Sequence, residues 1–175
     1  MALDIGPLGR LLEPCGDLPF NDAYNLFKEQ VIAGEKTGAD LVLIETMGDL
    51  YEIKAAVLAA KENTNLPVLV SMIFDEKGTL LTGADIKTAV VTLEGLDVDG
   101  IGMNCGLGPD QMLQLLKEMR EYSSTPIFIQ PNAGLPVSVN GKTTYNVTPE
   151  EFAQKQLSIL HNGACALGGC CGTTP

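Results

Sequence analysis

Three cysteines that follow short apolar segments are the residues of this sequence best suited to chemistry. Cys105 follows Met103-Asn104, and Cys170 and Cys171 stand together in a Gly-Gly-Cys-Cys-Gly-Thr-Thr-Pro motif. Adjacent cysteines rarely form a disulfide with each other, because their Cα atoms are only ~3.8 Å apart. Three thiols at strand ends can converge on one tetrahedral zinc ion and leave its fourth position for a reactant. We therefore predict a zinc site formed by Cys105, Cys170 and Cys171.

Other interpretations of the cysteines carry less weight. A single cysteine such as Cys105 is most often a small buried hydrophobic residue, but the Cys-Cys pair and the flanking motif favour the metal site. A thiol redox protein is disfavoured because no Cys-x-x-Cys pair is present. Cys165, expected inside the last apolar strand, and Cys15, in a polar loop, are predicted to be structural or incidental.

Three polar residues at the ends of apolar segments complete the candidate site. Glu45 carries a carboxylate that is costly to bury unpaired, so we expect it to meet a bound ammonium group or an internal lysine or arginine. Asn132 is either an oxygen ligand for the fourth zinc position or a turn residue in Asn-Ala-Gly. Asn104 is placed on the substrate side of the site, where we expect it to brace the zinc loop by hydrogen bonding.

Alternating strand and helix patterns are expected to position these residues. Amphipathic stretches with helical spacing lie between the apolar segments, and Thr148-Pro149 has the form of an N-cap followed by a first helical residue. This alternation predicts an α/β fold with a parallel sheet. The five predicted strands are Leu41–Glu45, Val68–Ile73, Gly100–Asn104, Ile127–Gln130 and Ala164–Leu167.

The places of the polar residues favour a barrel over an open sheet. They follow several different strands, as at the C-terminal face of a TIM barrel, whereas an open sheet gathers such residues mostly at one switch point. No glycine-rich dinucleotide motif follows a strand. We therefore expect a fold of the TIM (β/α)8 barrel family.

Composition limits the class of protein. The chain has 175 residues, 45% of them hydrophobic, which suits one domain over residues 1–175. Its formal net charge of -11 disfavours nucleic acids and anionic membrane surfaces as partners. No apolar run approaches the ~18 residues needed to span a bilayer. Five cysteines without a disulfide-scaffold spacing suit a reducing compartment, so we expect a cytoplasmic protein.

Four motifs of this sequence match one known family. They are Ile44-Glu45-Thr46-Met47, Met103-Asn104-Cys105-Gly106-Leu107-Gly108-Pro109, Pro131-Asn132-Ala133-Gly134 and the terminal Cys-Cys motif. Through them the sequence resembles the homocysteine S-methyltransferase family, and within it the homocysteine-binding module of cobalamin-dependent methionine synthases. The resemblance implies catalytic zinc on Cys105, Cys170 and Cys171, homocysteine held through its amino group by Glu45, and methylation of its thiolate to give methionine. It also implies methylcobalamin as a donor carried by other modules, with folate- and cobalamin-binding modules as partners.

The sequence departs from the family pattern at the start of the barrel. The family barrel begins with two further βα units that nothing in this chain matches, and Met1-Ala2-Leu3 has the pattern of a third strand. We therefore expect a partial barrel of about six strands that belongs to a longer or split barrel. The alternative function is a non-catalytic zinc-binding barrel fragment that needs a complementary chain.

Overall fold

A single parallel sheet organises the chain. The computed structural model describes residues 1–139 and 141–174, and its main sheet has six strands in which every neighbouring pair is parallel. This arrangement confirms the predicted α/β class and the number of strands. In spatial order the strands are β1 (Ala2–Ile5), β2 (Leu41–Met47), β3 (Val68–Met72), β4 (Gly100–Asn104), β5 (Ile127–Gln130) and β8 (Ala166–Leu167).

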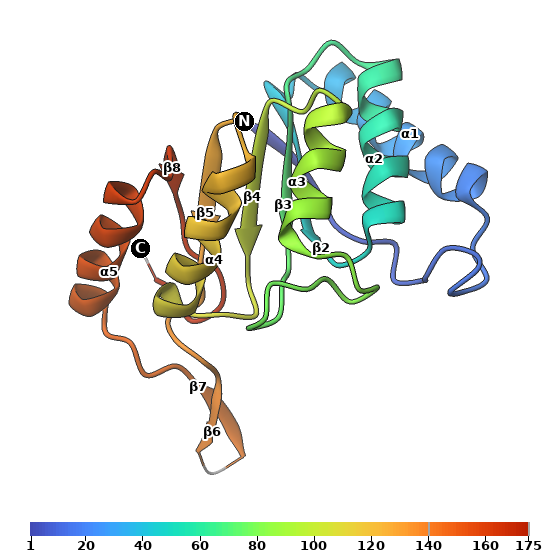
Figure 1. Cartoon of the computed structure of the whole chain (residues 1–175). Helices are drawn as coiled ribbons and strands as arrows, with labels where there is room; N and C mark the ends of the chain where they lie inside the picture. The colour runs from blue at the N-terminus through green and yellow to red at the C-terminus, as the bar shows by residue number, and fades with distance from the viewer. Residues whose placement is uncertain (140, 175) are drawn as a thin grey trace.

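Five helices and one hairpin connect the strands (Figure 1). Successive helices follow the strands across the sheet, with α1 packed on α2, α3 on α4 and α4 on α5. Within the described ranges, no helix is both long and apolar enough to cross a bilayer. The helices are α1 (Phe20–Lys36), α2 (Leu50–Asn63), α3 (Ile86–Gly95), α4 (Pro109–Tyr122) and α5 (Pro149–His161), and the antiparallel hairpin consists of β6 (Val137–Val139) and β7 (Lys142–Thr144).

The order of the strands is that of a barrel wall. In a doubly wound sheet the order reverses at a switch point, where ligands bind. Here each strand of the main sheet lies beside the next one along the chain, and between β5 and β8 the described residues add the hairpin to the connecting helix α5. All strand C-terminal ends consequently face the same side, so the loops that follow β2, β4, β5 and β8 can meet there.

Local signals in the sequence fix the helix starts. Thr148 caps α5 in a reciprocal capping box with Glu151, and Pro149 occupies the first turn, as the sequence predicts. Asp49 caps α2 by accepting a hydrogen bond from the backbone N–H of Tyr51. The first turns of both helices are therefore stabilised by side chains that the sequence places immediately before them.

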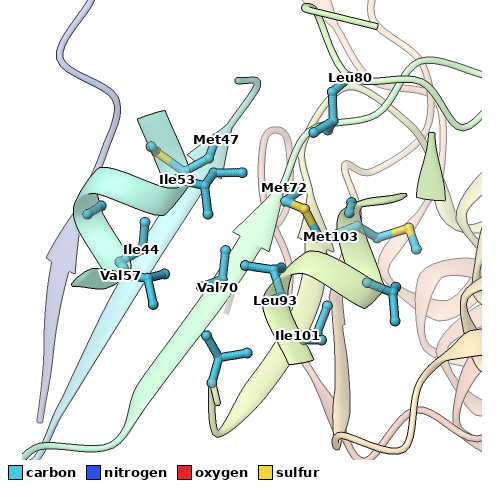
Figure 2. Close-up of a cluster of buried hydrophobic side chains, with 14 of the residues drawn as sticks. Ile44, Met47, Ile53, Val57, Val70, Met72, Leu80, Leu93, Ile101 and Met103 are labelled. Carbon is cyan, nitrogen blue, oxygen red and sulfur yellow. The ribbon is translucent and has the colours of Figure 1, made fainter. Parts of the chain in front are cut away.

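The hydrophobic core lies between the sheet and its helices (Figure 2). Strand residues that face the helices, such as Ile44, Val70 and Ile101, are fully buried against Ile53 of α2 and Leu93 of α3. Each such side chain contributes ~1.5–3 kcal/mol when it is removed from water. The core therefore anchors the strands whose far ends carry the candidate site.

The opposite face of the sheet is covered less completely. Leu41, Leu43 and Glu45 alternate with the buried residues of β2, and all three are half-buried. The last strand is also shorter than expected, since only Ala166–Leu167 pairs with β5. The prediction that Cys165 lies inside that strand is therefore wrong: it precedes β8 and is exposed.

Candidate metal and substrate site

Three cysteine sulfurs from distant parts of the chain meet at the C-terminal side of the sheet. The Sγ atoms of Cys105, Cys170 and Cys171 all lie within 4.8 Å of one another. Cys171 Sγ is 3.7 Å from that of Cys105 and 4.0 Å from that of Cys170. Sulfurs ~2.3 Å from a tetrahedral zinc ion would be ~3.8 Å apart. The spacing therefore fits three thiolates on one zinc ion.

A tight turn after β4 aims Cys105 at the other two thiols. Cys105 has a φ of 60°, in the left-handed region that few residues other than glycine adopt. Its backbone N–H donates to the carbonyl of Gln130 at 3.2 Å, and its own carbonyl accepts from Leu107 at 2.7 Å. Gly106, with a φ of 69°, continues the turn. Backbone hydrogen bonds thus hold a conformation that costs about 1–3 kcal/mol.

The adjacent cysteines are fixed through their backbones to the segment after β5. The N–H of Cys170 donates to the carbonyl of Pro131 at 2.9 Å. The N–H of Cys171 donates to Oδ1 of Asn132 at 3.0 Å, and its carbonyl accepts from Ala133 at 2.9 Å. Thr173 closes the turn by donating through its hydroxyl to the carbonyl of Cys170 at 2.7 Å. Both thiols are therefore presented by a rigid loop.

Asn104 links the thiols to two neighbouring strands. Its Oδ1 accepts from the hydroxyl of Ser71 at 2.7 Å and from the backbone N–H of Thr46 at 3.1 Å. Its Nδ2 donates to Oγ1 of Thr46 at 2.7 Å and lies 3.9 Å from the sulfur of Cys170. The side chain is almost fully buried. These contacts hold the end of β4 against β2 and β3, as expected for a bracing side chain. A direct contact of Asn104 with substrate stays a prediction.

A bulge in β2 places Glu45 and Thr46 at the same side of the sheet. The pairing with β3 shifts by one residue between Ile44 and Met47, and Thr46 has a φ of 59°. Such a φ is a strained conformation for a β-branched residue. Bulges re-aim side chains and are frequent near active sites. The two hydrogen bonds between Asn104 and Thr46, one donated by each residue, hold the strained residue in place.

Glu45 is a half-buried carboxylate without a cationic partner among the described residues. Its Oε1 accepts from Nε2 of Gln130 at 3.0 Å. Burial raises the pKa of the Glu45 carboxyl, the Gln130 hydrogen bond lowers it, and the charge of Asp4 raises it. The pairing with an internal lysine or arginine, left open by the sequence, is absent from this part of the structure. A bound ammonium group would offset the cost of burying this charge.

The Cys170 thiol is difficult to ionise without a nearby cation. Burial, followed by the neighbouring Cys105 thiol, raises the pKa of Cys170 to about 11 from the ordinary 9.0. Metal coordination deprotonates a thiol, so a bound cation would supply the positive charge that the cluster lacks. The thiols, together with the carboxylate of Glu45, can thus hold a metal ion and a molecule that carries an amino group.

The structure places the remaining predicted residue, Asn132, beside the cysteine pair. Its Oδ1, the atom expected to reach the metal, accepts the hydrogen bond of Cys171, and its role as a metal ligand stays a prediction. Ser71, Gln130 and Tyr145, whose ring lies against Gly172 next to Cys171, were not predicted from the sequence. Gln130 ends a predicted strand just as Glu45 does, which is a signal that could have identified it.

Comparisons with known proteins identify the relatives of this chain. The family model for homocysteine S-methyltransferase matches residues 1–175. Methionine synthase of Mycobacterium leprae is 35% identical over 177 residues, and methionine synthase of Mycobacterium tuberculosis is 34% identical over the same length. Both alignments cover 98% of this chain. The chain spans only 15% of the length of these two relatives.

Solved structures share the fold. The apo form of the homocysteine methyltransferase MmuM from Escherichia coli superposes with a TM-score of 0.77 at 22% identity, covering 98% of this chain and 57% of MmuM. The metallated form superposes with a TM-score of 0.69 at 24% identity, covering 87% of this chain and 49% of MmuM. The likeness confirms the expected partial barrel. By its sequence match along the whole length, this chain belongs to the homocysteine S-methyltransferase family.

Proposed function

We propose that this chain binds homocysteine and supports transfer of a methyl group to its thiolate, giving methionine. The observation that carries the proposal is the cluster of three thiols at the C-terminal side of a barrel-type sheet. Membership of a methyltransferase family favours this function over the alternative, a non-catalytic zinc-binding fragment that needs a complementary chain.

Cys105, Cys170 and Cys171 would hold the zinc ion. Their sulfur spacing fits tetrahedral coordination, and three protein ligands leave one position for the substrate. When bound, zinc would keep the substrate sulfur ionised at neutral pH and therefore nucleophilic. The protein's part is to hold that sulfur in one orientation, which lowers the entropic barrier to attack on a methyl group.

Glu45 would bind the ammonium group of homocysteine. Its carboxylate lies on the same side of the sheet as the thiols and has no cationic partner among the described residues. Gln130 fixes one carboxylate oxygen, so the side chain is oriented before the substrate arrives. A charge-assisted hydrogen bond of this kind contributes about 1.5–3 kcal/mol. The substrate would thus be held at its sulfur and at its amino group.

The methyl donor and the partner modules are proposed from the resemblance to methionine synthases. We infer that methylcobalamin is presented by another module, and that folate- and cobalamin-binding modules are the partners. Two relatives named methionine synthase extend far beyond the region that this chain matches, which leaves room for such modules.

Metal and substrate binding test the proposal directly. We expect the purified chain to bind one zinc ion, measured by competition with a chromophoric chelator, and to bind homocysteine in calorimetry only when zinc is present. Cys171→Ala should abolish both, whereas Cys165→Ala, which alters an exposed free thiol outside the cluster, should leave both unchanged. A wild-type chain that stays zinc-free with reduced thiols would refute the zinc site.

Methionine formation from homocysteine and added methylcobalamin then separates the two functions. Methyl transfer that depends on zinc and is lost in Cys171→Ala would support the enzyme. Tight zinc and homocysteine binding without any transfer, even after a chain carrying the complementary strands is added, would contradict it.

A further inference from the structure

Gln156 is a polar residue on the buried face of α5, the helix that packs beside β8 (Figure 1). Gln156 and Ile159 are the buried residues of this helix, and Gln156 is only 9% exposed. Its Nε2 donates a hydrogen bond to the carbonyl of Gly168 at 2.5 Å, whereas its buried Oε1 has no partner among the described residues. A buried amide with an unpaired atom lowers stability relative to an apolar side chain of the same size. Core packing therefore does not account for a glutamine at this position.

Gly168, the residue that Gln156 contacts, joins β8 to the cysteine loop. It directly follows β8 and stands two residues before Cys170. Its N–H donates to the carbonyl of Ile129 at 2.9 Å, so Gly168 is held by β5 through its N–H and by α5 through its carbonyl. That carbonyl belongs to the peptide that leads into the loop. The hydrogen bond from Gln156 consequently fixes the direction in which the loop with both adjacent cysteines leaves the sheet.

The same glycine contacts the residue that orients Glu45. A β-carbon on Gly168 would lie 2.9 Å from Cγ of Gln130, closer than real β-carbons approach another atom. The absence of a side chain therefore lets Gln130 pack directly on the backbone of Gly168. Gln130 in turn donates through Nε2 to Oε1 of Glu45 at 3.0 Å. A displacement of Gly168 would thus affect both the cysteine loop and the carboxylate proposed to bind the ammonium group.

We propose that Gln156 is a positioning residue that, through the carbonyl of Gly168, holds the cysteine loop in register with the Gln130–Glu45 pair. The inference rests on the proposed zinc and homocysteine site and adds a residue of α5 to it. The register is kept further along the loop by the N–H of Cys170, which donates to the carbonyl of Pro131 at 2.9 Å. Residues outside the ligand set orient metal ligands in this way and support metal affinity.

Gln156→Met tests the role because it keeps the size of the side chain while removing the hydrogen bond and the unpaired oxygen. We expect its zinc affinity, measured by chelator competition, to fall roughly 10-fold, the low end of the range for supporting residues. Its homocysteine affinity at saturating zinc should fall roughly 2- to 13-fold in calorimetry, the range for one net hydrogen bond. Gln154→Met is the matched control, because Gln154 is exposed on the same helix. A Gln156→Met chain that loses stability in urea but keeps both wild-type affinities would overturn the proposal.

Amide hydrogen exchange in the metal-free protein separates this inference from the zinc proposal. The N–H groups of Gly168 and Cys170 are hydrogen-bonded to the end of β5 and the residue after it, so their exchange reports local opening of the loop. In Gln156→Met both should exchange roughly 2- to 13-fold faster, while the matched control keeps the wild-type rates. Faster exchange in a chain that fails to bind zinc would refute the zinc site and support the role of Gln156 in holding the loop. Wild-type exchange at both amides of Gln156→Met would refute that role.

Discussion

Replacing Asn104 with alanine tests whether this side chain connects the thiols to the sheet. The amide accepts two hydrogen bonds, from Ser71 and from the backbone of Thr46, and donates one to the hydroxyl of Thr46. Ser71 is fully buried and Asn104 almost so, which means that water cannot replace the lost partner without opening the structure. The substitution therefore leaves up to three polar groups unsatisfied at the point where the β2 bulge must be held.

The expected loss of stability follows from those groups. A buried polar group left without its partner costs about 1–3 kcal/mol, and a strained φ such as that of Thr46 costs about 1–3 kcal/mol more if nothing holds it. We expect Asn104→Ala to lower the free energy of unfolding by about 3–5 kcal/mol. Ser71→Ala removes one of the three bonds and leaves Asn104 Oδ1 bound to Thr46, so it should cost only about 1 kcal/mol.

Urea unfolding of the metal-free proteins, followed by circular dichroism, gives both values under the same conditions. The two variants should have the same denaturant slope, since neither changes the surface exposed on unfolding. If Asn104→Ala costs no more than Ser71→Ala, the bonds to Thr46 contribute nothing and the proposed brace is wrong.

Four further outcomes follow from the site and the sheet. Glu45→Gln should weaken homocysteine binding by about 1.5–3 kcal/mol, and calorimetry should show this difference vanish as pH falls through the raised pKa of Glu45, where the wild-type carboxylate also becomes neutral. The metal-free chain should lose stability as pH rises from 9 to about 11, because the folded-state pKa of Cys170 lies above its ordinary value and the neutral thiol is favoured; Cys170→Ala should lack this loss. Gly172→Ala should weaken zinc binding, because a β-carbon there would collide with the Tyr145 ring and shift the adjacent Cys171, whereas Gly38→Ala, at a similar φ in open space, should leave it unchanged in the chelator assay. Residues 1–175 alone should self-associate in light scattering, because β1 and β8 are unpaired edges among the described strands; a monodisperse monomer at high concentration would argue against this.

Apolar periodicity predicted much of the fold because it reflects burial directly. The segments Gly100–Asn104 and Ile127–Gln130 are strands with the predicted ends, and the Thr148-Pro149 signal begins α5 where expected. Helical spacing is present in the other helices too: the buried residues of α3 are Ile86, Ala89, Val90 and Leu93, which lie on one face. The hairpin between β5 and α5 is short and mostly exposed, so burial leaves no pattern in it.

The thiols of the candidate site could be predicted, but the residues that hold them could not. Cysteines at strand ends are chemically unusual and stand out in any sequence. Ser71 and Thr46 are common strand residues, and only the register of β2, β3 and β4 brings them to Asn104. A bulge changes that register by one residue without a signature in sequence spacing.

The candidate site also depends on strain that sequence patterns cannot express. Thr46 and Cys105 both adopt left-handed φ values at the ends of strands, where a glycine would be expected from backbone preference alone. A glycine at either position would relieve the strain but remove a side chain: the hydroxyl that binds Asn104 in one case, a thiol of the cluster in the other. Hydrogen bonds between Asn104 and Thr46 hold the first conformation, and the bond from the N–H of Cys105 to the carbonyl of Gln130 holds the second. The same hydrogen bonds therefore connect the stability of the ends of β2 and β4 to the geometry of the thiols. Loss of the Asn104 side chain should for this reason lower the stability of the fold and also disturb the positions of the thiols.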